Sequence, residues 1–430
     1  MNRIVLVGNG FDLAHGLKTS YSDFINDFWK NKAKHIIENH KERRYEDEDI
    51  VIDPVPHKLM YDKNRNYNEF NQNLFETNGS KVNFKNKFLE VITKHHDINK
   101  WVDIENMYYL ILKNSFLGDK KNSLYKNKTK RLNQDFLRIQ NLLVEYLKKE
   151  VYVYPSKIPE ETLSRIKSKI GSIIFSRYHL KDLSEITAQK IIEEKYKETE
   201  EFIKTNVFTP EQINDFNIKD AATYNHFKYE INREKFFKFI INESNSRIFN
   251  FFPDQTLILN FNYTPITDYY KEPYKFNYPN EVQGDARNTE VINIHGSIDF
   301  SYNNPIIFGY GDELDDDYKE IEKLDNNEYL ENIKSIKYLE TDNYKRLLEF
   351  INSDLYQVII MGHSCGNSDR TMLNTIFEHE NCASIKFYYH KINQKADNYR
   401  DIVMNISRNF NDKAIMRDRV VNKKYCEPLL

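Results

Sequence analysis

The sequence has few of the residues that build disulfide frameworks or cysteine zinc sites. Only three of its 430 residues are cysteines (Cys365, Cys382 and Cys426), and none of them forms a C-x-x-C pair. Stable disulfides are characteristic of oxidising compartments, whereas isolated cysteines fit a reducing one. The sequence therefore predicts neither a disulfide framework nor a cysteine zinc site, and it favours a cytoplasmic location.

Long apolar runs and an excess of one charge are also lacking. The apolar run at the N-terminus is too short for a signal peptide, and no run is long enough to cross a membrane. The 62 basic and 65 acidic residues give a net charge of −3, which argues against binding nucleic acid through bulk positive charge. A chain of 430 residues can form two or three domains.

The histidines and acidic residues lack the spacings of metal sites. His35 and His40 are five residues apart, whereas ligands on one helix face stand three or four apart. His95 and His96 are adjacent and would point to different sides of a helix. The acidic residues 312–317 lack the glycine and terminal glutamate of a calcium loop. We therefore expect no metal site.

The first two dozen residues contain the strongest local pattern. Residues 4–7 form a β-branched apolar run typical of a buried strand, Gly8 and Gly10 follow, and a short helix is predicted to stop at Gly16. Such a turn gathers backbone N–H groups that can bind an anion, typically a dinucleotide pyrophosphate. Leu13 replaces the third glycine of the dehydrogenase pattern G-x-G-x-x-G, so a tight turn without a ligand stays an alternative.

The middle of the chain is predicted to be mainly helical. Ser20 and Asp23 resemble a capping box, and the charged, proline-bearing residues 41–68 predict a long exposed loop. From about residue 70 to residue 252, apolar residues recur at helical spacing. We therefore interpret residues 31–252 as a mainly helical insertion.

Strand-like apolar runs return after residue 252, and most are followed by small or polar residues. These runs are residues 256–259, 291–294, 306–308, 358–361 and 385–389. Open α/β sheets bind ligands at the carboxyl ends of their parallel strands. We therefore expect a Rossmann-like, mostly parallel α/β sheet formed by residues 1–30 and 253–425 and split by the helical insertion.

Asn262 and His295 each follow one of these predicted strands. A histidine titrates near neutral pH and can act as a general base. An asparagine can position a water or a ribose hydroxyl without adding charge. A turn-forming asparagine and a satisfied core histidine would have the same spacing, so both interpretations stay open.

Residues 362–366 match the nucleophile motif G-x-S-x-G between a strand and a predicted helix. A serine hydrolase would use Ser364, and only Asp369 with His379 or His390 keeps the chain order serine, aspartate, histidine. Asp369 begins the adjacent helix, which is a poor position for reaching such a histidine. The alternative is another strand-to-helix turn, in which Ser364 and Asp369 bond backbone N–H groups or a ligand ribose.

Six stretches together resemble the AbiH family of bacterial abortive-infection (phage-defence) proteins. They are GNGFDLAHGLKTSYSDF near the start, WVDIE in the helical part, and then NFNYT, IHGS, FGYGDE and GHSCGNSD. This family in turn resembles the sirtuin-like NAD-binding domains of other phage-defence proteins. In those domains a glycine turn holds the dinucleotide, an asparagine and a histidine act in catalysis, and a late G-x-S segment contacts the cofactor.

The resemblance implies a role for each matching residue. Asn262 would hold a water or a ribose hydroxyl and His295 would be the base, so these two are the candidate catalytic residues. The residues implied to bind the dinucleotide are Gly8, Asn9, Gly10, Phe11, Asp12, Gly362, Ser364 and Asp369. Two departures from the sirtuin pattern are Thr264, where an aspartate is frequent, and Asp12, where a serine is frequent.

The implied activity is that of a NAD glycohydrolase (NADase), which hydrolyses NAD to nicotinamide and ADP-ribose. NAD would be the substrate, and the absence of the sirtuin zinc module argues against protein deacylation. The helical insertion would serve assembly into a homo-oligomer or the response to a phage-derived trigger. A non-catalytic nucleotide-binding sensor or oligomerisation scaffold is the alternative from another class.

Overall fold

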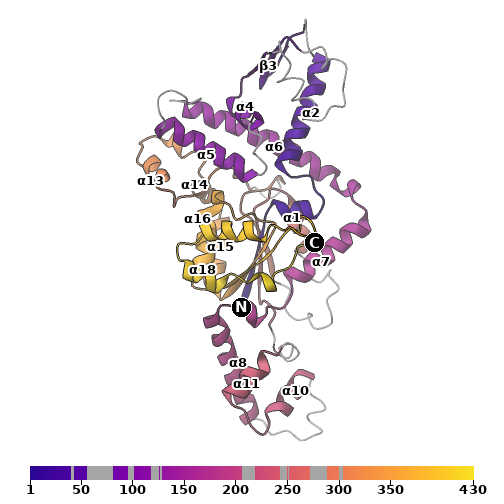
Figure 1. Cartoon of the computed structure of the whole chain (residues 1–430), viewed down its shortest axis with the longest axis vertical. Helices are drawn as coiled ribbons and strands as arrows, with labels where there is room; N and C mark the ends of the chain where they lie inside the picture. The colour runs from indigo at the N-terminus through magenta and orange to yellow at the C-terminus, as the bar shows by residue number, and fades with distance from the viewer. Residues whose placement is uncertain are drawn as a thin grey trace.

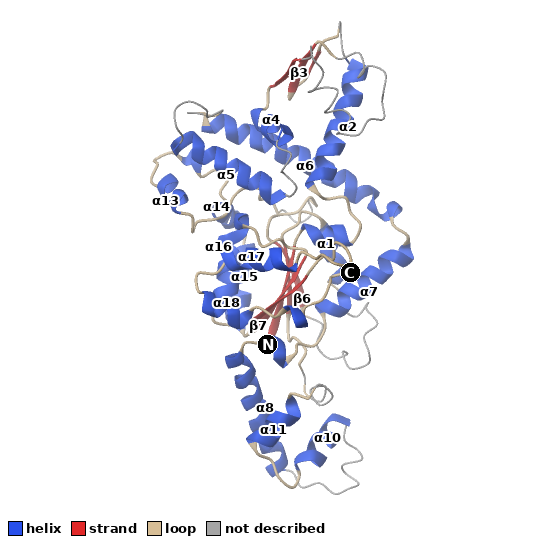
Figure 2. Ribbon diagram, viewed as in Figure 1, coloured by secondary structure: helices blue, strands red, loops and turns tan. Residues whose placement is uncertain are grey.

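A five-stranded parallel sheet lies at the centre of the molecule (Figure 2). Its strands are β1 (Asn2–Val7), β5 (Thr256–Asn260), β6 (Thr289–Asn293), β7 (Tyr356–Met361) and β8 (Cys382–Tyr388). They lie in the order β6-β5-β1-β7-β8, and all neighbouring pairs are parallel. The predicted mostly parallel α/β sheet is therefore confirmed, with β1 in its middle.

The computed structural model describes most of the chain. The described residues are 1–39, 43–55, 81–94, 101–117, 125, 128–205, 218–242, 249, 251–271, 288–299 and 304–430. Within these ranges, no helix combines the length and the apolar character that crossing a bilayer requires.

Helices cover both faces of the sheet. The apolar side chains of β1 alternate between two hydrophobic cores, one on each face. Ile4 and Leu6 belong to the core that includes α15 (Asn343–Ser353), α16 (Arg370–Glu378) and α17 (Tyr399–Arg408). Val5 and Val7 belong to the core on the opposite face, which includes residues of α6 (Thr129–Lys157) and α7 (Glu160–Ile174). The result is a three-layer α/β arrangement in which all of β1 is buried.

One layer of this arrangement comes from the stretch interpreted as an insertion. Ile170 and Ile174 of α7 pack on the sheet. The buried Arg3 of β1 donates hydrogen bonds to the carbonyl oxygens of Ile174 and Ser176, at 2.8 and 2.6 Å. The division of the chain at residues 30 and 252 stays a prediction, and α2 (Tyr21–Asn39) runs through residue 30.

A helical region lies beyond the carboxyl edge of the sheet, at the upper end of Figure 1. Its helices are α2, α4 (Lys87–Lys94), α5 (Trp101–Leu117) and the N-terminal part of α6. They share one hydrophobic core with a small antiparallel sheet of β2 (Tyr45–Glu46), β3 (Ile50–Asp53) and β4 (Lys81–Phe84).

This small sheet corrects the prediction that residues 41–68 form a long exposed loop. Tyr45, Ile50 and Ile52 are buried, because β2 and β3 form a hairpin that packs on the helices. Residues 41–42 and 56–68 of the predicted loop lie outside the described residues.

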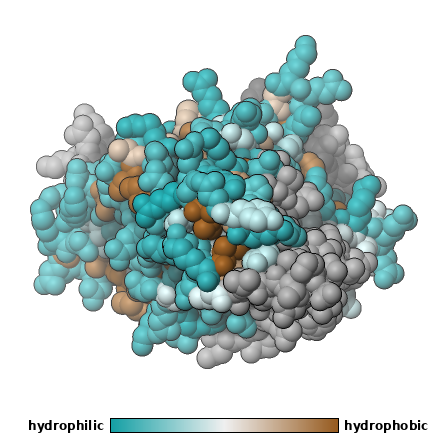
Figure 3. Space-filling view, turned by 90° about the horizontal axis from the view of Figure 1, so that it is seen from below, coloured by the Kyte–Doolittle hydropathy of each residue, from teal (hydrophilic) through white to brown (hydrophobic). Residues whose placement is uncertain are grey.

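A second group of helices lies at the opposite end of the molecule. It comprises α8 (Glu185–Thr205), α10 (Ile218–Phe227) and α11 (Arg233–Ile240), and it has a separate aromatic-rich core. Figure 3 shows the molecule from this end, where hydrophilic side chains predominate and apolar ones show in separate groups.

Short elements connect the strands and layers. They are α1 (Asn9–Ala14), α13 (Asp316–Glu322), α14 (Lys334–Lys337), α18 (Lys413–Arg419) and the 3₁₀ helices η2 (Leu180–Asp182), η3 (Pro265–Tyr270), η7 (Asn327–Tyr329), η8 (Tyr338–Glu340), η9 (Asn367–Asp369) and η10 (Lys423–Tyr425). The predicted capping box is confirmed, because the backbone N–H of Asp23 bonds Ser20 Oγ at 3.1 Å and that of Ser20 bonds the Asp23 carboxylate at 3.2 Å.

The prediction of a strand at residues 306–308 is wrong. These residues have no regular secondary structure. Pro305 has no backbone N–H to give to a strand ladder, and the N–H of Ile307 donates instead to the carbonyl oxygen of His295 at 2.8 Å. The segment therefore bonds the turn that follows β6 and does not add a strand.

Candidate functional site

The glycine turn after β1 packs directly on the turn after β7. The backbone N–H of Gly10 donates to the carbonyl oxygen of Gly362 at 2.9 Å. A Cβ atom on Gly10 would lie 2.8 Å from Gly362 Cα, and one on Gly362 would lie 2.1 Å from Phe11 N. Gly362 also has a φ of +70°, which glycine adopts readily. These glycines are therefore needed for the close approach of two backbone segments, and three N–H groups of the expected anion site, those of Gly8, Gly10 and Phe11, already have backbone partners.

The helix after this turn follows the prediction from the sequence. α1 begins at Asn9 and ends before Gly16, which has a φ of +86°. Asn9 accepts a hydrogen bond from the hydroxyl of Thr19 at 2.6 Å. The ring of Phe11 is buried in the core on the α7 side of the sheet. Asn9 and Phe11 thus have structural contacts, and their predicted role in binding a dinucleotide stays a prediction.

Asp12 lies at the centre of a buried polar cluster, in which its hydrogen-bond donors are neutral groups. Its carboxylate accepts hydrogen bonds from Asn262 Nδ2 at 2.8 Å and from Thr264 Oγ1 at 2.7 Å. Burial raises the pKa of Asp12 to about 7, although the two hydrogen bonds oppose this shift. Asn262 Nδ2 also donates to the carbonyl oxygen of Gly8 at 3.0 Å. We call Gly8, Asp12, Asn262 and Thr264 the Asp12 cluster.

The side-chain amide of Asn262 has one atom left for a ligand. Its two N–H bonds point to Gly8 and Asp12, which fixes the orientation of the amide group. Among the described residues, no donor is seen to bond the amide oxygen of Asn262. This oxygen can therefore accept a hydrogen bond from a water or a hydroxyl group.

His295, the second predicted catalytic residue, lies in a different cluster. Its Nε2 atom is 3.3 Å from Asp369 Oδ1 and 3.0 Å from the Tyr338 hydroxyl. His295 is 4% exposed, and burial, together with the nearby Lys334 ammonium, lowers the pKa of His295 to about 4. The imidazole is therefore neutral near pH 7. Since an ionised carboxylate only accepts, Nε2 carries the proton toward Asp369 and Nδ1 keeps its lone pair.

Two further charged residues surround Asp369. The Lys334 ammonium lies 2.8 Å from Asp369 Oδ1 and 2.9 Å from Glu105 Oε1. Burial alone would raise the pKa of Asp369, but Lys334 and His295 hold it well below its usual range. Burial raises the pKa of Glu105 to about 7 against the opposing effect of Lys334. We call Glu105, His295, Lys334, Tyr338 and Asp369 the His295 cluster.

Phe261 packs against the rings of two histidines at this edge. Its ring centroid is 5.1 Å from that of His295 and 4.2 Å from that of His363. His363 Nδ1 accepts the backbone N–H of Cys365 at 3.0 Å, so its Nε2 carries the proton and faces Asp369 Oδ2 at 3.6 Å. His363 is a buried neighbour of the site that was not singled out from the sequence.

The geometry does not support the serine hydrolase alternative. No histidine among the described residues is seen to bond the Ser364 hydroxyl. Asp369 and His379 flank opposite ends of α16, whose nine residues span about 13 Å. His390 is exposed. Apart from Gly362, the residue with left-handed backbone in this turn is Cys365, with a φ of 54°, and not the serine expected at a nucleophile elbow.

The match to a known protein family covers nearly the whole chain. Residues 4–390 match the family described as Bacteriophage abortive infection AbiH. The chain belongs to the AbiH family. The AbiH match includes the glycine turn, both polar clusters and the helical region, and it connects the protein with abortive infection of phage-infected bacteria. No curated protein and no solved structure matches the chain.

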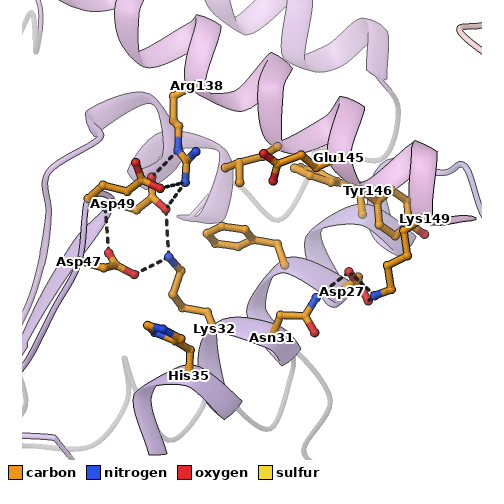
Figure 4. Close-up of a pocket in the computed structure, with 14 residues that line it drawn as sticks. Asp27, Asn31, Lys32, His35, Asp47, Asp49, Arg138, Glu145, Tyr146 and Lys149 are labelled. Carbon is orange, nitrogen blue, oxygen red and sulfur yellow. Dashed lines mark hydrogen bonds and ion pairs between the residues drawn. The ribbon is translucent and has the colours of Figure 1, made fainter. Parts of the chain in front are cut away.

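The AbiH chain also has a pocket of about 470 Å³ in its helical region (Figure 4). α2, α6 and the β2–β3 hairpin form its walls, with five acidic and three basic side chains. Lys32 pairs with Asp47 and Asp49 at 2.6 and 2.9 Å, and Lys149 pairs with Asp27 at 2.9 Å. None of the residues predicted for the site lines this pocket.

Sequence reasoning missed Glu105 and Lys334 as site residues. Glu105 is the last residue of the stretch WVDIE, so the resemblance to the AbiH family contained a signal for it. Lys334 belongs to a charged segment without a distinctive motif. Buried lysines and glutamates are rare unless they are paired, which makes their meeting at this edge informative.

Proposed function

We propose that this AbiH-family protein is a phage-defence effector that hydrolyses NAD to nicotinamide and ADP-ribose at the carboxyl edge of its central sheet. The observation that carries the proposal is the meeting of four strand ends at two polar clusters, one with Asn262 and one with the neutral His295. The strand order reverses between β1 and β7, and dinucleotides bind at such a point in doubly wound sheets. The same order supports a Rossmann-like, sirtuin-type sheet.

The reaction would break the bond between ribose C1′ and the nicotinamide nitrogen. The electron pair of this bond neutralises the pyridinium of the leaving group, so nicotinamide needs no proton. Water adds to the oxocarbenium-like C1′ atom and transfers one proton to His295 Nδ1. A weak base suffices here because the electron-poor carbon acidifies the attacking water.

The surrounding groups suit this charge development. Asp369 lies beside His295 Nε2 and would stabilise the imidazolium that forms. The free amide oxygen of Asn262 would accept a hydrogen bond from the attacking water or from a ribose hydroxyl. The proposed location is the cytoplasm, and the proposed roles of the helical insertion, residues 31–252, are homo-oligomer assembly or the response to a phage-derived trigger.

The test is NAD turnover by the purified full-length protein, with nicotinamide and ADP-ribose separated and quantified. His295→Ala should lower turnover by about 100-fold or more, because it removes the general base. Asn262→Ala should also lower it. His379→Ala is the matched control, since this histidine lies at the far end of α16 and should leave turnover unchanged. Normal turnover by His295→Ala would remove His295 from the mechanism.

A non-catalytic nucleotide sensor is the second candidate, and a specific observation favours it. The N–H of Gly10 and both amide N–H bonds of Asn262 already have partners within the protein. An edge that is satisfied without a ligand can bind a nucleotide without acting on it. Tight binding of NAD or ADP-ribose without release of nicotinamide, in the presence of phage-infected cell extract, would favour the sensor.

A further inference from the structure

The helical region contributes Glu105 of α5 to the His295 cluster. Glu105 is 5% exposed, and its Oε1 atom accepts the backbone N–H of Gly309 at 3.4 Å. α5 also packs against η9, which ends with Asp369. The position of α5 is therefore coupled directly to the segment that carries the carboxylate beside His295.

Lys334 joins Glu105 to Asp369 in a continuous buried chain of contacts. Its ammonium lies 2.9 and 3.0 Å from the two carboxylate oxygens of Glu105 and 2.8 Å from Asp369 Oδ1. The same Oδ1 atom lies 3.3 Å from His295 Nε2. Lys334 and His295 thus compete for one oxygen atom, while Glu105 competes with that oxygen for Lys334.

We propose that Glu105 and Lys334 are positioning residues through which the docking of α5 sets the hydrogen bond between Asp369 and His295. With Glu105 in place, the ammonium charge is shared by two carboxylates, and Asp369 Oδ1 remains a strong acceptor for His295. When α5 moves away, Lys334 pairs with Asp369 alone and weakens that acceptor. The helical region then controls the tautomer and the orientation of His295.

A purely stabilising role does not account for this cluster. Taking an ammonium and two carboxylates out of water is costly, and apolar side chains of the same shape commonly stabilise a core equally well. The three charged groups come from α5, α14 and η9, so each contact depends on how these segments are docked. Such an arrangement is sensitive to a small displacement of one helix.

The tautomer of His295 is the direct readout, measured by ¹⁵N NMR of the full-length protein with ¹⁵N-labelled histidine. The His295 signal is assigned by its loss in His295→Asn. The parent should carry the proton on Nε2. In Lys334→Met, burial is no longer opposed by the ammonium and raises the pKa of Asp369, so a protonated Asp369 can donate to Nε2 and the imidazole proton should move to Nδ1. Glu105→Gln should shift the tautomer population in the same direction by a smaller amount.

Two additional variants separate helix docking from direct electrostatics. Tyr109 of α5 stacks on Tyr310 at a centroid distance of 3.9 Å, and replacing it leaves the charges of the His295 cluster unchanged, so Tyr109→Leu should loosen α5 and shift the tautomer as Glu105→Gln does. Lys386→Met breaks another lysine–aspartate pair, with Asp182 at 2.8 Å, and should leave the tautomer unchanged. An unchanged tautomer in both Glu105→Gln and Tyr109→Leu would overturn the inference.

The effect on turnover rests on the proposed function, whereas the tautomer does not. If the parent hydrolyses NAD, Glu105→Gln should lower kcat by about tenfold and leave KM unchanged, because substrate contacts stay in place. A change in KM alone would contradict a positioning role. If the parent releases no nicotinamide, the NMR result still decides the positioning role, so the two ideas can fail separately.

Discussion

Two aspartates at the same edge of the sheet have opposite environments. Asp12 is 2% exposed and meets the neutral donors Asn262 and Thr264, and burial raises its pKa to about 7. Asp369 is 8% exposed, but Lys334 and His295 overcome the effect of burial and hold its pKa well below the usual range. Similar burial thus gives two different carboxylates, and the partners decide the charge of each.

This difference suggests distinct roles for the two clusters. Groups whose environments push their pKa values apart are a common way to divide work in an active site. Asp369 stays an anion at every pH near neutrality and suits the stabilisation of an imidazolium or of a cationic transition state. Asp12 is balanced between neutral and charged forms and keeps Asn262 oriented. The predictions below test this division.

The largest effect is expected from removing the cation of the His295 cluster. Lys334→Met leaves Glu105 and Asp369 buried without their shared partner, so the free energy of unfolding at pH 7 should fall by about 3 to 5 kcal/mol. Urea denaturation followed by circular dichroism measures this loss. The double variant Lys334→Met/Glu105→Gln should recover part of it, because only one carboxylate then remains. Equal losses in the single and double variants would contradict the shared ion pair.

The next effect is a pH dependence that comes from Asp12. Because the pKa of Asp12 is about 7 in the folded protein and 3.8 in the unfolded chain, unfolding releases a proton between these values. The parent should therefore lose stability relative to Asp12→Asn as the pH rises from 4 to 8, by on the order of 4 kcal/mol. The measurement is urea unfolding of both proteins across this range.

For Asp369→Asn, the opposite dependence of stability on pH is expected. Its pKa is lowered in the folded protein, so its contribution to stability is present above about pH 4 and is lost as the pH falls through the folded value. The destabilisation caused by Asp369→Asn should be full at pH 7 and should shrink below pH 4. Parallel pH profiles for the two aspartate variants would show that both clusters have the same electrostatics.

Local patterns predicted the elements around the site well. The apolar residues 4–7 lie inside β1, and the helix after Gly10 ends before Gly16 as expected. The runs that became β5, β6, β7 and β8 were located within a few residues. These features depend on side-chain alternation and on glycine within a short stretch, so neighbouring residues contain the information.

Contacts between distant segments could not be predicted in this way. Lys334 bonds Glu105 and Asp369, which are 229 and 35 residues away. Nothing near Lys334 distinguishes it from a solvated surface lysine. The same limit applies to α7, whose apolar stripe fits any helix, although it covers one face of the central sheet.

The direction of a side chain after a strand is also set by its neighbours. Asn262 and His295 both follow strands, and their chemistry led to the prediction of one catalytic pair. In the structure Asn262 bonds Gly8 and Asp12, whereas His295 faces Asp369 and Tyr338. Spacing in the sequence placed both residues at the carboxyl edge of the sheet but contained no information about these partners.

A smaller loss of stability is expected from substitutions in the two glycine turns, which pack on each other and hold the two clusters side by side. A Cβ on Gly362 would lie 2.1 Å from Phe11 N, and the φ of +70° disfavours other residues. Gly362→Ala should therefore lower the free energy of unfolding by about 2 to 3 kcal/mol. Gly10→Ala should cost less, because the nearest atom is 2.8 Å away and its φ is not positive. Thermal or urea unfolding of both variants tests this order, and a larger loss for Gly10→Ala would contradict it.

The smallest effect is expected from one hydroxyl of the Asp12 cluster. Thr264→Val keeps the side-chain shape but removes the donor that lies 2.7 Å from Asp12 Oδ2. The loss should be about 1 kcal/mol at pH 8, where Asp12 is charged, and smaller at pH 5, where it is protonated. Because this hydrogen bond opposes the effect of burial, its removal should also raise the pKa of Asp12 further, which moves the pH profile of unfolding to higher pH. The same substitution in the Asp12→Asn background should lose its pH dependence. An equal loss at both pH values in the parent background would mean that Thr264 acts through packing and that the charge of Asp12 depends on Asn262 and burial alone.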